Sequence, residues 1–335
     1  MKFLRSFIIL LMAAAAVSLV SCKDDDDSSS STKEYLTGNI IFDFPAYVQY
    51  GDIIHVVPSA VYKGSEKTDS LVAYRWVDPF SGVADTLRKE GDPAGKTKEF
   101  DFTMSKDTLG NFSLIVSAWA DGYYEKTTSA AFTAVNPTLG TGSLKGYDFL
   151  PSVKSFTDAR DGQKYYYNTV GGKDWMIQNL AWAGAGVAYN DADVMSYIFG
   201  RYYTWTEATT ACPAGWHLPS SAEFKTLAEA GGGKEDVAAG SLMVDATFNG
   251  SKMWEFWPDV KITNTSRFSA IPVGYASIED DQPEFKGFEK YAMFWTSDSV
   301  NSDMAVVRYL YVDKTVLFGG EFGKNSIRTS VRCVK

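Results

Sequence analysis

The stretch YTWTEATTACPAGWHLPSSAEF, residues 203–224, carries the signals that decide the fold of the C-terminal half of this chain. Four of its residues recur at the spacing of one helix face: Trp205, Ala208, Thr209 and Cys212. Pro213 and Gly215 follow directly and end that helix. The sequence therefore predicts a short first helix within residues 202–212.

A second helix is predicted immediately downstream. The run GWHL is short and extended, and Pro219 closes it. Ser220 and Glu223 have the spacing of a capping box, which marks a helix start. Three residues give this helix an apolar face, and the glycines at 231–233 end it: Phe224, Leu227 and Ala228.

His217 is the one residue of the stretch that raises the question of catalysis. A general base needs a partner within hydrogen-bond reach. The only other histidine, His55, lies far away in the N-terminal half, so no catalytic companion is expected for His217. The pattern favours a structural role for this histidine.

The N-terminus indicates export and lipid attachment. Lys2 and Arg5 precede an apolar run at 7–20, which is the form of a signal peptide over residues 1–21. The run ends in LVSC, which resembles the lipobox of bacterial lipoproteins and predicts acylation of Cys22. The alternative is an ordinary signal peptide with an incidental cysteine.

An acidic tether follows over residues 22–35. Its run KDDDDSSSS cannot pack, because four adjacent carboxylates repel one another. It resembles the acidic export signal of Bacteroidetes-type surface lipoproteins, which implies display on the outer face of the outer membrane. A plain flexible spacer is the competing interpretation.

Composition and cysteine count narrow the function classes. The 335 residues carry a net charge of −9 and no basic cluster, which argues against nucleic acid and against anionic lipid surfaces as partners. The only membrane contact expected is the lipid anchor. Beyond Cys22 two cysteines remain, Cys212 and Cys333. An even pair in an exported protein predicts one disulfide, which closes a loop of about 120 residues and contributes roughly 4–5 kcal/mol.

Residues 36–135 are predicted to form an all-β sandwich. Short β-branched or alternating runs are separated by turn residues, as is typical of sandwiches: GNIIFDF, IIHVV, LVAYRWV, KEFDFTM, NFSLIVSAW and SAAFTAV. Trp76 is expected in the core between the sheets. The stretch DTLGNFSLIVSAWADGYY resembles a hairpin of PKD-like and other immunoglobulin-like bacterial domains. A spacer role is favoured, with ligand binding by the loops as the alternative.

A glycine-rich linker is predicted at 136–147, where NPTLGTGSLKG separates two dense apolar regions. Residues 148–335 then form the second domain, of the α+β class. Five of its segments resemble the Fibrobacter succinogenes major paralogous domain: FTDARDGQKYYYNTVGGKDWMIQNLAW, GRYYTWTEATTACPAGWHLPSSAEFKTL, RFSAIPVGY, FWTSD and SIRTSVRCVK. That resemblance implies a secreted or surface module and no particular reaction.

The same domain is similar, more distantly, to C-type-lectin-like folds. Those folds tie a first helix to the last strand by a disulfide, which implies the pairing of Cys212 with Cys333. HLPSSAEF also resembles a run of formylglycine-generating-enzyme-like domains, whose catalytic cysteines have no counterpart here.

Two candidate ligand sites follow from the lectin resemblance. Gln282 and Glu284, with the proline between them, resemble part of a calcium-dependent sugar site. Thr296 and Ser297 stand where Asn and Asp are expected, so Asp298 would have to substitute for a ligand. We therefore expect no cofactor and interpret this segment as a solvated acidic loop. Calcium binding by the same loop is the alternative.

Calcium-independent binding is the second candidate. In KMWEFWPDV, residues 252–260, the aromatic side chains are too crowded to share one core, so Trp254 and Trp257 are candidate glycan-stacking residues. Other aromatic runs, such as YYYNTV and RYLYV, are attributed to strand packing.

The sequence predicts a non-enzymatic surface lipoprotein that presents a lectin-like module to glycan or protein ligands. It contains no phosphate-binding glycine loop, HExxH, CxxC or G-x-S-x-G motif. The first alternative is a structural or assembly component of a surface complex. A carbohydrate-active hydrolase is the second alternative, because forty-one carboxylates always allow a pair at glycosidase spacing.

Overall fold

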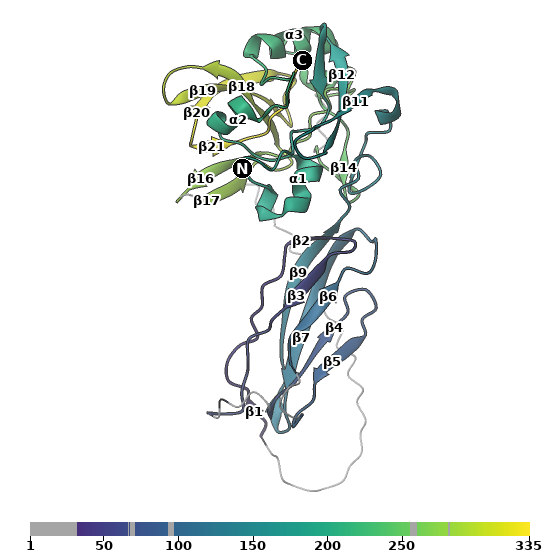
Figure 1. The fold of residues 1–335 in the computed structure, drawn as a ribbon, viewed down its shortest axis with the longest axis vertical. Helices are drawn as coiled ribbons and strands as arrows, with labels where there is room; N and C mark the ends of the chain where they lie inside the picture. Colours follow the sequence, from purple (N-terminus) through teal and green to yellow (C-terminus); the bar gives the residue numbers. More distant parts are fainter. Residues whose placement is uncertain (1–31, 66, 68–70, 93–96, 255–259, 281) are drawn as a thin grey trace, which may run out of the picture.

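The computed structural model describes residues 32–65, 67, 71–92, 97–254, 260–280 and 282–335. Cys22 and Trp257, with the signal peptide and most of the tether, lie outside the described residues. A mostly β N-terminal region is followed by a mixed α+β region, as predicted at that level (Figure 1). Within the described residues no helix is long and apolar enough to cross a membrane.

The N-terminal region contains one five-stranded sheet and two smaller ones. The large sheet has the order β2 (Tyr47–Gln49), β9 (Lys126–Val135), β7 (Gly110–Trp119), β4 (Ala73–Val77) and β5 (Ala84–Arg88). The two-stranded sheets pair β3 (Ile53–Val56) with β6 (Phe100–Thr103), and β1 (Glu34–Tyr35) with β8 (Tyr123–Tyr124). Buried side chains of β3 and β6 meet those of the large sheet in one core. Trp76 packs against that core and stacks on Phe100, with ring centroids 5.0 Å apart.

One strand prediction in this region was wrong, and two strands of the large sheet, β2 and β5, were not predicted. The run 38–44 is not a strand: Ile41 bonds only to Ser59 and leaves 66% of its side chain exposed. Conversely β5 was missed, because its first three residues are exposed and show no apolar alternation.

The predicted linker is a closed, hydrogen-bonded loop. The Asn136 N–H donates to the Ser143 hydroxyl (2.8 Å), and the Ser143 N–H donates to the Asn136 carbonyl (2.8 Å). The Gly142 N–H donates across the loop to the Thr138 carbonyl. The Asn249 side chain, from the C-terminal region, donates to a carbonyl at the end of β9 (3.1 Å). The junction is therefore held by hydrogen bonds within the loop and by a hydrogen bond from the C-terminal region to the end of β9.

In its described residues, the C-terminal region contains four three-stranded sheets, four helices and two 3-10 turns. Its sheets are β10 (Leu144–Lys145), β14 (Thr247–Phe248) and β15 (Ser251–Lys252); β11 (Lys154–Thr157), β12 (Lys164–Val170) and β13 (Lys173–Met176); β17 (Gln282–Lys286), β16 (Tyr275–Glu279) and β21 (Ile327–Arg328); and β18 (Tyr291–Ser299), β19 (Met304–Tyr311) and β20 (Leu317–Gly323). The helices are α1 (Asp193–Phe199), α2 (Trp205–Ala211), α3 (Ser221–Gly232) and α4 (Ala239–Leu242), and the turns are η2 (Leu150–Ser152) and η3 (Tyr189–Asp191).

Both predicted helices of the deciding stretch are present as α2 and α3. The capping box of Ser220 and Glu223 begins α3 as predicted, and its predicted apolar face is buried. A second capping box, Thr204 with Glu207, begins α2 and was not foreseen. The helix starts three residues later than the predicted range, and its buried residues are Ala208 and Ala211. Of the predicted face, Trp205 and Cys212 are half-buried, whereas Thr209 is exposed, so its assignment to that face was wrong.

The sheet β18–β19–β20 is the centre of this region. Phe294 and Leu310 pack on one face with α3 in one cluster. Trp295, Val307 and Ala305 pack on the other face with residues of α2. Trp295 is fully buried and its indole N–H donates to the Tyr203 carbonyl (2.8 Å). This sheet fixes the side chains of the candidate site.

Candidate functional site

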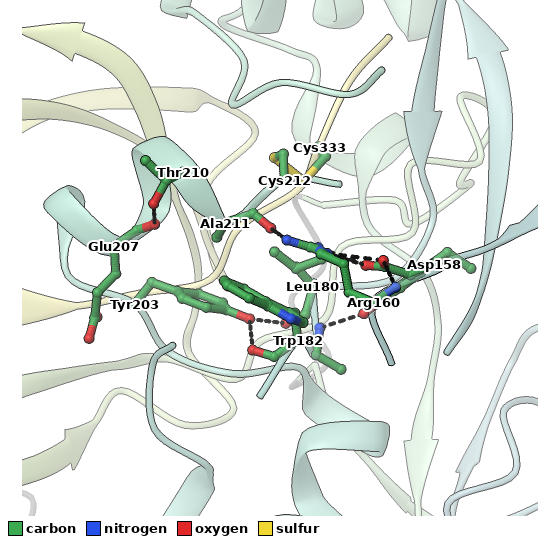
Figure 2. Close-up of a disulfide and its surroundings, with 12 residues drawn as sticks. Asp158, Arg160, Leu180, Trp182, Tyr203, Glu207, Thr210, Ala211, Cys212 and Cys333 are labelled. Carbon is green, nitrogen blue, oxygen red and sulfur yellow. Dashed lines mark hydrogen bonds and ion pairs between the residues drawn. A yellow bond between two sulfur atoms is a disulfide. The ribbon is translucent and has the colours of Figure 1, made fainter. Parts of the chain in front are cut away.

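The predicted disulfide is present. Cys212, at the end of α2, is bonded to Cys333 near the C-terminus, with Cα atoms 5.8 Å apart (Figure 2). Next to it, Val334 forms antiparallel bridges with His217 and with Trp175. The bond thus holds the last segment of the chain against the connecting segment between α2 and α3.

The surroundings of the disulfide are occupied by structural contacts. The Arg160 guanidinium lies 4.1 Å from the ring centroid of Trp182, pairs with Asp158, and donates to the Ala211 carbonyl (2.8 Å), beside the disulfide (Figure 2). Gly184 lies against the Trp182 ring so closely that a Cβ there would overlap it. Because the backbone of Gly184 and the Arg160 guanidinium both cover this indole, Trp182 is not available for ligand stacking.

His217 has a polar partner, contrary to expectation. Its Nε2 lies 2.8 Å from Glu223 Oε1, and 51% of the imidazole side chain is exposed. Lys173 approaches the same oxygen at 3.0 Å, and Ser220 donates to the other one. Burial alone would raise the pKa of Glu223; the hydrogen bonds from Ser220, His217 and Lys173 outweigh it and lower that pKa to about 2. The sequence missed this contact because Glu223 was assigned only a capping role.

Trp254 was wrongly predicted to be a ligand-stacking residue. Only 2% of its surface is exposed, and its indole N–H donates to the Ala270 carbonyl at 3.2 Å. It belongs to the core cluster that also contains Phe224 and Phe268. A tryptophan with its N–H satisfied inside the core has no face for a ligand.

Gln282 and Glu284 are exposed and lie on one face of the β16–β17 hairpin. Their cross-strand partners on that face are Glu279 and Ser277. Lys286 lies between two carboxylates, 2.6 Å from Glu279 and 2.8 Å from Glu284. The hydrogen bonds to these carboxylates raise the pKa of Lys286 above its ordinary value. Glu284 thus takes part in an ion-pair network on the hairpin.

In β18, the next strand along the chain, the side-chain oxygens of Thr296 and Asp298 make hydrogen bonds within the protein. Asp298 accepts a hydrogen bond from the Ser221 N–H (2.6 Å) at the start of α3, and the Thr296 hydroxyl donates to the Val306 carbonyl. Within the described part of the chain, no three His, Cys, Asp or Glu side chains are grouped so that they could hold a metal ion.

Five half-buried aromatic residues form a continuous strip next to the face of the β16–β17 hairpin that carries Gln282 and Glu284. We call it the tyrosine surface: Tyr275 of β16, Tyr291 of β18, Tyr309 and Tyr311 of β19, and Phe318 of β20. Neighbouring ring centroids lie 6.3 Å apart for Tyr275–Tyr291, 6.1 Å for Tyr291–Tyr309, 4.6 Å for Tyr291–Tyr311 and 5.1 Å for Tyr309–Phe318. Four different strands therefore contribute to one aromatic platform.

Backbone register holds the strip in place. Tyr291 pairs with Tyr311, and Tyr309 pairs with Phe318, so these rings share one side of the sheet. Gly287 packs beneath Tyr291, where a Cβ would lie 2.6 Å from the ring. Tyr275 pairs with Lys286, so the platform adjoins the face that carries Glu284.

The platform also offers polar groups. Among the residues that the structure describes, the hydroxyls of its four tyrosines have no hydrogen-bond partner. The pKa of Tyr291 is raised, mainly by burial and to a smaller extent by the neighbouring tyrosines and Asp313. Its hydroxyl therefore stays protonated and can donate a hydrogen bond. The run RYLYV, predicted to serve strand packing, also contributes to this surface; the alternation of Tyr309 and Tyr311 along β19 is the sequence signal for it.

A separate groove of about 690 Å³ lies between the junction loop and β11–β12. Its lining includes the apolar side chains of Leu139, Leu150 and Val153, together with Lys164 and Tyr166. The Lys164 ammonium lies 4.8 Å from the Tyr166 ring centroid and covers it. This leaves the tyrosine surface as the better aromatic platform.

Comparison with known families identifies the C-terminal half. Residues 169–335 match the Fibrobacter succinogenes major domain (Fib_succ_major), and the chain matches no curated protein. The matched residues include the disulfide, α2, α3 and the whole tyrosine surface. From residue 169 to residue 335 this chain is therefore a Fibrobacter succinogenes major domain.

Proposed function

We propose that this chain is a non-enzymatic lipoprotein of the outer membrane, displayed on the cell surface, and that its C-terminal module binds glycan through the tyrosine surface. The acylated Cys22 anchors it. The N-terminal region serves as an immunoglobulin- or PKD-like spacer between that anchor and the module.

The proposed C-type-lectin-like architecture is supported by the disulfide. It joins the end of an early helix to the last segment of the chain, and between α2 and α3 His217 forms an antiparallel bridge with that last segment. The fold class alone does not supply a ligand. The ligand has to be argued from the surface itself.

The tyrosine surface is the observation that carries the proposal. A sugar ring has an apolar face of C–H bonds that packs on an aromatic ring, and hydroxyls around its edge that need partners. Half-exposed tyrosines supply both, since each joins an apolar ring to a polar tip. Four such residues in register, beside exposed Gln282 and Glu284, form a platform wide enough for an oligosaccharide.

Binding to an array of neutral, acidic and amino glycans tests this proposal. The Cys22→Ser chain should bind at least one class, and Tyr311→Ala should lose most of that signal. Tyr197→Ala is the matched control, because Tyr197 is 53% exposed on α1 and lies outside the platform. A blank array for the folded chain, or equal loss in both variants, contradicts the proposal. In that case binding to cell-surface proteins is the alternative to examine.

A further inference from the structure

We propose that the free end of the N-terminal region docks on the lipid surface to which the chain is anchored. The contact is the aromatic tip, which we define as Lys33, Tyr35 and Tyr124. This inference rests on the lipid attachment at Cys22 proposed above. It adds a second, non-covalent contact with the membrane.

The aromatic tip is exposed and compact. Tyr35 leaves 74% of its surface in solvent and Tyr124 leaves 47%. Their rings stack with centroids 4.9 Å apart, and the Lys33 ammonium lies 5.9 Å from the Tyr124 centroid. Two large aromatic side chains thus meet on the surface, where water covers them in the free protein.

The tip cannot turn inward, because its backbone is fixed. β1 pairs in parallel with β8, and the Glu34 N–H donates to the Gly122 carbonyl at 2.9 Å. The next residue, Leu36, is 2% exposed and belongs to the core of the N-terminal region. Alternation along the strand therefore directs Tyr35 outward.

The tip is the part of the described structure that the anchor can bring closest to lipid. It lies at the end of the N-terminal region farthest from the α+β region (Figure 1). Only nine residues lie between Cys22 and Thr32, the first described residue. A segment of this length spans about 35 Å at most.

The chemistry of the tip suits a zwitterionic headgroup layer. Tyrosine places its ring among the upper acyl carbons and its hydroxyl in water, and lysine extends its ammonium toward phosphate. Nearby, Lys63 pairs with Glu90 and Arg75 pairs with Glu125, while Glu34 of β1 is exposed beside Lys33 and offsets its charge. The covalent anchor raises the local lipid concentration, so that a weak contact is sufficient.

Amide hydrogen exchange on phosphatidylcholine vesicles tests the inference. The acylated mature chain is compared with the soluble Cys22→Ser chain, and peptides covering residues 33–36 and 121–125 are followed. We expect roughly tenfold slower exchange there in the anchored chain. The double variant Tyr35→Ser/Tyr124→Ser should remove that protection. Both side chains are exposed, so its thermal midpoint should stay near that of the unchanged chain.

Tyr50→Ser is the matched control, because Tyr50 is 63% exposed and follows β2 at the other end of the region. It should keep the protection. Equal exchange in anchored and soluble chains overturns the docking and leaves the proposed lipoprotein intact. Protection that survives in the double variant also overturns it. A mature chain without an acyl group on Cys22, by mass spectrometry, overturns the anchor and the docking together, whereas glycan binding is then still testable.

Discussion

Arg332 shows how a single residue holds the C-terminal module together. Its guanidinium is fully buried and donates to Asn179 Oδ1 (2.6 Å) and to the carbonyls of Met176, Phe268 and Ser269. Its faces lie against the rings of Phe268 and Phe294, with centroids 4.7 and 5.6 Å away. Burial lowers the pKa of this group to about 10, which still leaves it charged at neutral pH.

Replacing this residue should be costly. Arg332→Met removes the donor to four buried acceptors, of which the Ser269 carbonyl keeps another hydrogen bond, from the Tyr147 hydroxyl (3.4 Å). We expect a loss of about 3–5 kcal/mol in the free energy of unfolding. Denaturant unfolding followed by tryptophan fluorescence measures it. Arg328→Met is the comparison, because Arg328 is partly exposed and pairs mainly with Glu207, so its loss should be much smaller. Equal stability of Arg332→Met and the unchanged chain would refute the assigned role.

Individual residues were also where sequence reasoning was least reliable. Trp254 and Trp295 both sit in aromatic runs, and both are buried with satisfied indole N–H groups. Tyr309 sits in a similar run and contributes to the surface. The difference depends on which strand pairs with which, and that register is a non-local property that local sequence does not encode.

At the scale of elements, the sequence predicted a helix boundary correctly where a local backbone interaction determines it. The capping box at Ser220 and Glu223 predicted the start of α3, and the glycines at 231–233 predicted its end. By contrast, the run 38–44 has β-type composition but no strand partner. Glycine content also predicted a linker where the chain forms the closed loop at 136–143.

The start of α3 predicts a dependence of stability on pH. The folded-state pKa of Glu223 is lowered from 4.5 to about 2, so its stabilisation is present above pH 4.5 and is lost as the pH falls toward 2. Glu223→Gln should cost about 2 kcal/mol at pH 7 and much less at pH 2.5. Denaturant titrations at both pH values measure the difference. Glu229→Gln, on the exposed side of the same helix, should show no such trend; a constant deficit in Glu223→Gln would contradict the assignment.

The junction loop should be intolerant of a single methyl group. A Cβ at Gly142 would lie 2.7 Å from the Thr138 carbonyl and closer still to that of Asn136. Gly142→Ala should therefore destabilise the chain by about 2–3 kcal/mol. Gly319→Ala is the control, since a Cβ there meets only the flexible Arg308 side chain at 3.4 Å. Similar thermal midpoints for the two variants would show that the loop is loose.

For the molecule as a whole, the sequence indicated the order of parts but not how they function together. A mostly β region, a junction and a disulfide-closed α+β region follow one another as expected. The platform at residues 275–318 escaped prediction because four strands assemble it. Its tyrosines lie far apart in the sequence and become neighbours only when the strands pair.

The disulfide should contribute strongly to global stability. Its two cysteines are 121 residues apart, so Cys212→Ala/Cys333→Ala is expected to lose about 4 kcal/mol in the chain-entropy model. Unfolding curves with and without reductant measure this loss. Reductant should shift the midpoint of the unchanged chain toward that of the double variant and leave the variant itself unaffected. A reductant-insensitive midpoint in the unchanged chain would contradict the expected contribution.

Hydroxyl-radical footprinting of tyrosines, with and without the best glycan from the array, tests the central claim most directly. The account predicts slower oxidation of Tyr291, Tyr309 and Tyr311 in the complex, with Tyr197 unchanged. Protection confined to Tyr166, which would place the ligand in the groove beside the junction, would contradict it.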